Sequence, residues 1–140
     1  MIDFVYNTDF QIENQGVFSK WLMEVAAAEN YLIHDLVFLF VSDQELLAMN
    51  KKHLKHNYFT DVITFGELEG DKISGNIAIS VDRVLDNSKT YDVSFDEELK
   101  RVMVHGLLHI IGYNDKTKKE KLTMSQKETD ALKMFHVKQA

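Results

Sequence analysis

Two histidines and an aspartate in the second half of the chain have the types and spacing of a metal-ligand set. His105 and His109 are four residues apart, and Gly112 and Asp115 follow them. On a helix, residues four apart share one face about one turn apart. Gly112 can adopt the left-handed conformation that ends a helix, so Asp115 can return near the two imidazoles. Two imidazoles and a carboxylate can hold a transition metal and leave one position open for water, as a catalytic site needs.

The composition limits the remaining chemistry. The chain of 140 residues has no cysteine, so disulfides and thiolate zinc sites are excluded, and a cytoplasmic location is expected. The length predicts one domain over residues 1–140. No run of apolar residues is long enough to span a membrane. The start of the chain lacks a basic region followed by an apolar one, so we expect no signal peptide.

The residue after the first histidine separates this motif from that of zinc peptidases. In the H-E-x-x-H motif of those enzymes, the glutamate acts as the general base. Gly106 stands at that position here, which argues against a peptidase and requires a base from elsewhere. The glycine indicates a close approach to the helix, either by substrate or another backbone, or by a sheet packed tightly against it.

Capping patterns predict where most helices begin. Glu follows Ser by three residues in Ser42–Glu45, Ser94–Glu97 and Ser125–Glu128, and each box is expected to start a helix. The second of these helices carries the two histidines at the edge of its apolar stripe. The third is expected to form the C-terminal helix. Apolar periodicity predicts an earlier helix over about residues 15–29, and Ser80 can cap a short one.

Four apolar segments predict a small sheet. They are Ile2–Tyr6, Leu36–Val41, Val62–Phe65 and Asn76–Ser80. Leu36–Val41 is a continuous apolar run, so we expect a central strand covered on both faces. The order of elements predicts an α+β or mixed α/β fold, in which about five helices pack on one small mixed four-stranded sheet.

Several ordered motifs resemble a known family. The His-Gly-x-Leu-His-x-x-Gly-Tyr pattern of residues 105–113 is similar to the signature of the YbeY family, the bacterial rRNA maturation endoribonucleases. Three further segments resemble family motifs, namely Phe40–Leu46, Asn50 with Thr60–Phe65, and Gly75–Ser80. The resemblance implies a zincin-like fold, one zinc ion and single-strand-specific endoribonuclease activity. It also implies rRNA and the small ribosomal subunit as partners, in 3′-end maturation and ribosome quality control.

The resemblance assigns the metal ligands residue by residue. His105 and His109 match the first two ligands, and Asp115 stands where the family usually has a third histidine. Zinc accepts carboxylates, but the more negative ligand set should weaken the acidification of bound water. Nickel and other divalent ions also suit imidazole.

Basic residues provide candidate RNA contacts. The formal net charge of −6 argues against a protein that binds nucleic acid over much of its surface. Seven of the 16 Lys and Arg residues fall in two short segments: Lys51, Lys52 and Lys55, then Lys116, Lys118, Lys119 and Lys121. They are either solvated surface runs or contacts for flanking phosphates. Tyr58, Phe59 or Tyr113 could stack on unpaired bases, or pack in the core.

Two departures from the family pattern bear on activity. Leu54 replaces an arginine that could hold a phosphate bidentately, and Asn76 replaces an aspartate. Lys52 or Lys55 could substitute for the arginine only as a point charge. Asp61 is the candidate catalytic residue, which would orient water or act as base; a strand or turn cap is its alternative.

The departures leave a second hypothesis open. The chain could be a ribosome-assembly binding factor whose metal site is mainly structural, and Leu54 favours that alternative. The pattern carries no clear oligomeric signal, and a monomer is favoured.

Overall fold

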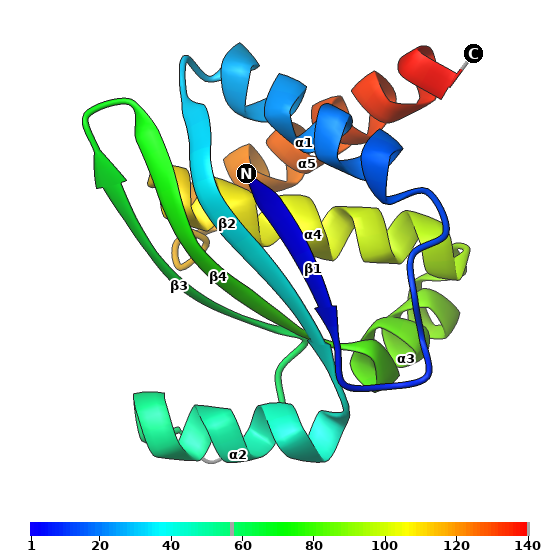
Figure 1. Ribbon diagram of the computed structural model, residues 1–140. Coiled ribbons are helices and arrows are strands. Elements are labelled where there is room, and N and C mark those ends of the chain that lie inside the picture. Colours follow the sequence, from blue (N-terminus) through cyan, green and yellow to red (C-terminus); the bar gives the residue numbers. More distant parts are fainter. Residues whose placement is uncertain (57, 140) are drawn as a thin grey trace.

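The fold is a mixed sheet with helices on one face and at one end (Figure 1). The computed structural model describes residues 1–56 and 58–139, with side chains up to residue 135. Its elements are β1 (Ile2–Tyr6), α1 (Gln15–Ala28), β2 (Leu32–Val41), α2 (Asp43–Leu54), β3 (Val62–Glu69), β4 (Lys72–Ser80), α3 (Val81–Tyr91), α4 (Phe95–Ile111) and α5 (Lys118–Gln139). The predicted α+β fold is confirmed, with one four-stranded mixed sheet.

The strands run in the order β1-β2-β4-β3. The pairs β1–β2 and β2–β4 are parallel, and β3 pairs antiparallel with β4 at the edge. All four predicted strands are present, but β2, β3 and β4 are longer than predicted. The extra residues of β3 and β4 form a largely polar hairpin around Gly70, in which Ile73 is buried in the main core but the added residues of β3 are exposed.

The central strand β2 is covered fully on one face only. Leu36, Phe38 and Phe40 are buried in the main core beneath the helices. Leu39, on the opposite face, is half-buried and packs in a small cluster with residues that include Leu46 of α2. Figure 1 shows α2 at one end of the sheet rather than across it. The prediction that both faces are covered is therefore wrong away from that end, since apolar side chains there remain half-exposed.

The main core lies between the sheet and helices α1, α4 and α5. Trp21 of α1 is buried and donates from Nε1 to the backbone oxygen of Ala131 in α5 at 2.8 Å. Met103 and Leu107 anchor α4 in the same core. Because α4 is held on both sides, its remaining half-buried edge can present side chains at fixed positions.

Helix capping agrees with three predicted starts and overturns a fourth. The side chains of Ser42, Ser80 and Ser94 each accept a hydrogen bond from the backbone N–H three residues on. The predicted start at Ser125 is wrong, because α5 begins at Lys118. Thr117 and Glu120 form a reciprocal capping box there, with each side chain accepting from the other's backbone N–H. Once that earlier box has started the helix, Ser125 lies inside it.

Within residues 1–56 and 58–139, none of the helices combines the length and apolar character that crossing a membrane requires.

Candidate metal centre

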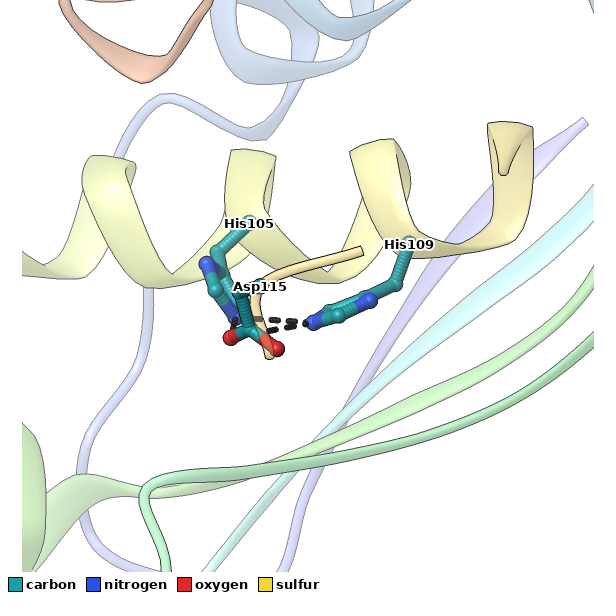
Figure 2. A group of neighbouring side chains, drawn as sticks. All are labelled: His105, His109 and Asp115. Carbon is teal, nitrogen blue, oxygen red and sulfur yellow. Dashed lines mark hydrogen bonds and ion pairs between the residues drawn. The ribbon is translucent and has the colours of Figure 1, made fainter. Parts of the chain in front are cut away.

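Three potential ligand atoms converge at the end of α4 (Figure 2). His105 and His109 lie one turn apart on the half-buried edge of the helix. Gly112 then ends the helix with φ at 123°, in the left-handed region, and Asp115 returns to the two rings. The Nε2 atoms of the histidines are 3.0 Å apart. Asp115 Oδ2 lies 3.3 Å from Nε2 of His105 and 3.5 Å from Nε2 of His109.

These spacings fit a single bound cation. Metal–ligand bonds of about 2.0–2.1 Å in tetrahedral geometry place neighbouring ligand atoms ~3.3 Å apart. The observed separations of 3.0 to 3.5 Å bracket that value. Three protein ligands leave a fourth position open, and the donor set of two imidazoles and one carboxylate suits zinc and similar divalent ions. The group can therefore bind a metal ion.

Glu128 supports the first histidine from behind. Its Oε2 lies 2.6 Å from Nδ1 of His105, and its Oε1 lies 3.2 Å from Arg101. Burial alone would lower the pKa of His105, but the hydrogen bond to Glu128 and the charges of Glu128, Asp115 and Asp61 raise it in the metal-free protein. The carboxylate accepts from Nδ1–H and leaves the opposite nitrogen free for a metal.

The sequence reasoning missed this role by placing Glu128 in a capping box. A signal was present, because Glu128 shares its helix face with the buried residues Met124, Ala131 and Leu132. A carboxylate on an apolar face requires a partner.

A second set of contacts holds the loop that carries Asp115. Tyr113 donates from its hydroxyl to Glu29, and Lys127 of α5 pairs with the other oxygen of Glu29 at 2.9 Å. The ring of Tyr113 is half-buried and packs on the main core. Tyr113 thus anchors the loop, whereas Tyr58 and Phe59 remain exposed.

Gly106 permits close packing of α4 on the sheet. A Cβ atom at this position would lie 2.8 Å from Cγ2 of Ile77 and 3.2 Å from Cγ2 of Thr64. Of the two expected reasons for the glycine, the structure supports helix–sheet packing.

Asp61 lines two cavities, each of which is also lined by the ligand residue His105. It lines a cleft of about 460 Å³ together with His105, His109 and Asp115. It also lines a cavity of about 520 Å³ with Glu98 and Arg101. Asp61 accepts from Nδ2 of Asn87 at 3.2 Å. Burial raises its pKa, opposed by the charge of His105 and by backbone hydrogen bonds at residues 61 and 62. The carboxylate is thus hydrogen-bonded to the backbone of its own turn and also lines the cleft of the candidate site.

Two of the candidate lysines, Lys55 and Lys116, are chain neighbours of residues that line the same cleft. Leu54 and His56, which flank Lys55, line it, and Asp115 precedes Lys116. The six candidate contacts are all exposed: Lys51, Lys52, Lys55, Lys116, Lys118 and Lys119. Leu54 therefore stands in the cleft where the family pattern places an arginine. Asn76 instead lines a groove on the open face of the sheet, beside Phe65.

A helix-borne pair of histidines, an aspartate from the next turn and an open coordination position define a candidate metallohydrolase centre in an α+β protein. Comparison with known proteins identifies the family of this chain. The sequence model described as Endoribonuclease YbeY matches residues 4–136. The chain therefore belongs to the Endoribonuclease YbeY family.

Individual relatives agree with that family. The protein named Endoribonuclease YbeY in Flavobacterium psychrophilum is 44% identical over 139 residues, covering 99% of each chain. Its namesake in Karelsulcia muelleri is 46% identical over 128 residues, covering 91% of each chain. The solution structure of TM1509 from Thermotoga maritima has the same fold, with a TM-score of 0.68 and 24% identity, and covers 96% of this chain and 89% of that one.

Proposed function

We propose that this protein is a zinc-dependent, single-strand-specific endoribonuclease that acts in 3′-end maturation of small-subunit rRNA and in ribosome quality control. The observation that carries the proposal is the convergence of His105, His109 and Asp115 in one cleft. Membership of a family named for endoribonuclease activity supports the reaction class. The partners are rRNA and the small subunit, in the cytoplasm, and the protein acts as a monomer.

The ligand set accounts for hydrolysis. When bound, zinc would act as a Lewis acid and lower the pKa of a coordinated water. Asp61 lines the same cleft, and burial raises the pKa of its carboxyl group toward the range in which it can take and return a proton. Asp61 would orient the attacking water, and Asn87 would hold the carboxylate in place.

The surroundings of the cleft suit an unpaired strand. The exposed Lys55 and Lys116, whose chain neighbours line the cleft, would contact flanking phosphates as point charges. Tyr58 is exposed, lines the cleft and stacks on His56 with ring centroids 5.2 Å apart, which provides a surface for an unstacked base. Asp115 adds negative charge at the centre, although Lys116 is its neighbour in the chain. A bound metal would therefore acidify its water less than it would with three histidine ligands.

One observation favours a second function. Leu54 is in the cleft and cannot hold a phosphate bidentately, so transition-state binding would be weakened. In that case the protein would bind the assembling small subunit, and its metal would chiefly stabilise the end of α4.

Cleavage of a single-stranded rRNA fragment separates the two functions. The protein is stripped with a chelator, reloaded with zinc and compared with His109→Ala under the same conditions. The nuclease proposal predicts cleavage by the reloaded protein alone, and no cleavage of the same sequence in a duplex. Equal cleavage by parent and variant would exclude a catalytic metal at this site. A variant that loses metal and thermal stability, beside a metal-loaded parent that binds RNA without cutting it, would support the binding factor.

A further inference from the structure

Glu128 is a buried carboxylate with both oxygens engaged by α4. Only 7% of the residue is exposed. Oε2 is 2.6 Å from Nδ1 of His105, and Oε1 is 3.2 Å from the guanidinium of Arg101. Burying a carboxylate costs free energy unless it is paired, so the two contacts on α4 fix where this side chain can lie.

The contact with His105 determines which ring nitrogen is available. A carboxylate accepts a hydrogen bond, so His105 must carry its proton on Nδ1. In the neutral ring that a metal requires, Nε2 then carries the lone pair, and this atom lies 3.0 Å from Nε2 of His109 and 3.3 Å from Oδ2 of Asp115. Such a contact orients the ring and makes the ligand nitrogen more basic.

We propose that Glu128 is the positioning residue of the metal centre, and that through it the docking of α5 is coupled to metal binding. This inference rests on the proposed metal centre but not on RNA cleavage. Glu128 has no part in the capping box to which its sequence position would assign it. It lies 23 residues beyond His105 and contacts the centre only because α5 packs against α4.

The residue before Glu128 belongs to the contacts that hold the loop of Asp115. Lys127 pairs with Glu29, and Glu29 accepts from the hydroxyl of Tyr113 in the loop that leads to Asp115. Two consecutive residues of α5 thus secure the helix-borne ligand and the loop-borne ligand. A metal that requires both ligands in place must favour the docked position of α5, and the docked helix must favour the metal equally.

Zinc affinity measured by competition with a chromophoric chelator tests the proposal. Glu128→Ala is expected to weaken binding about 10- to 100-fold. Glu128→Gln keeps an acceptor of the same size but loses the charge, so it should show a smaller loss. Asp130→Asn is the matched control, because this exposed carboxylate lies on the same helix away from the centre, and its affinity should equal that of the parent.

Two spectroscopic measurements distinguish positioning from general stability. In the zinc-loaded parent, long-range proton–nitrogen correlation spectra should show the His105 proton on Nδ1, protected from exchange with water. Glu128→Ala should lose that protection. Addition of zinc should also slow amide hydrogen exchange in α5 of the parent and of Asp130→Asn, and should slow it less in Glu128→Gln.

These measurements test the positioning role of Glu128 whether or not the protein cleaves RNA. Parental zinc affinity in a folded Glu128→Ala would overturn the proposal. If that variant does not fold, parental affinity in Glu128→Gln would overturn it. A parent that binds zinc with these dependences but cleaves no RNA would contradict the proposed nuclease and leave the positioning role of Glu128 intact.

Discussion

The hydroxyl of Tyr113 donates a hydrogen bond of 2.5 Å to Glu29, across 84 residues of sequence. Glu29 follows directly after α1, and Tyr113 lies two residues before Asp115. The contact therefore ties the end of one helix to the loop that carries a candidate ligand. Lys127 completes the arrangement by pairing with the second oxygen of Glu29.

Removal of this hydroxyl should loosen the loop without altering the ligands themselves. We expect Tyr113→Phe to lower the free energy of unfolding by about 1 kcal/mol, and to weaken zinc binding, because Asp115 is then less well held. Urea denaturation and chelator competition measure the two effects. Tyr91→Phe removes the hydroxyl of an exposed tyrosine and should change neither quantity. A Tyr113→Phe variant indistinguishable from this control would show that the loop does not depend on the contact.

Close packing at Gly106 makes a separate prediction. In Gly106→Ala the new methyl group must displace Ile77 or Thr64, so the variant should lose about 1–3 kcal/mol of stability. Gly16→Ala in α1 is the control, because a methyl group there meets nothing within 4 Å and should be neutral or slightly stabilising. Thermal and urea unfolding of the two variants provide the comparison. Parental stability in Gly106→Ala would mean that α4 does not need a glycine against the sheet.

Buried Glu98 should make stability depend on pH. Burial, followed by the charge of Asp61, raises its pKa from 4.5 to about 7. Between these values the folded protein keeps a proton that the unfolded chain releases, so this group lowers stability as pH rises from about 4.5 to 7. Above about pH 7 the cost of burying the charged Glu98 carboxylate lowers the free energy of unfolding by up to about 3 kcal/mol.

Glu98→Gln should remove that dependence. Urea midpoints of the metal-free protein, measured from pH 4.5 to 8, should fall less steeply in this variant than in the parent. Glu69→Gln, at the exposed end of β3, should reproduce the parental slope. Parallel curves for parent and Glu98→Gln would contradict a proton held by Glu98.

Asp61 should affect the rate of cleavage more than the affinity for metal. Its carboxylate lines the cleft but lies outside the group of three converging ligand atoms. We expect Asp61→Asn to reduce the rate of RNA cleavage about 10²- to 10⁴-fold, the range typical of a general base, while zinc affinity changes little. Asp86→Asn, an exposed carboxylate on α3, should cleave at the parental rate. Unchanged cleavage by Asp61→Asn would leave it with a capping role alone.

The sequence predicts the parts of this fold that depend on local chemistry. Ser42 and Ser94 accept the hydrogen bonds that the capping pattern requires, and the spacing of His105 and His109 places both rings on one helix face. The turn at Gly112 likewise brings Asp115 back, since it depends on neighbouring residues alone.

Features that depend on packing between distant segments were not predictable from local patterns. The pattern of Ser125 and Glu128 matches a capping box, but the box at Thr117 starts the helix eight residues earlier, and Glu128 is then turned toward His105. Coverage of β2 depended on where α2 lies, which the apolar run of the strand does not reveal. The contacts of Glu29 are equally non-local.

The rate of RNA cleavage as a function of zinc per chain tests the central claim most directly. Metal-free protein is titrated with zinc, and cleavage of a single-stranded rRNA fragment is measured at each ratio. If His105, His109 and Asp115 hold one catalytic ion, the rate should rise in proportion to zinc and become constant at one equivalent. His109→Ala should show no such rise. Full cleavage before any zinc is added, or the same titration curve in His109→Ala, would contradict the account.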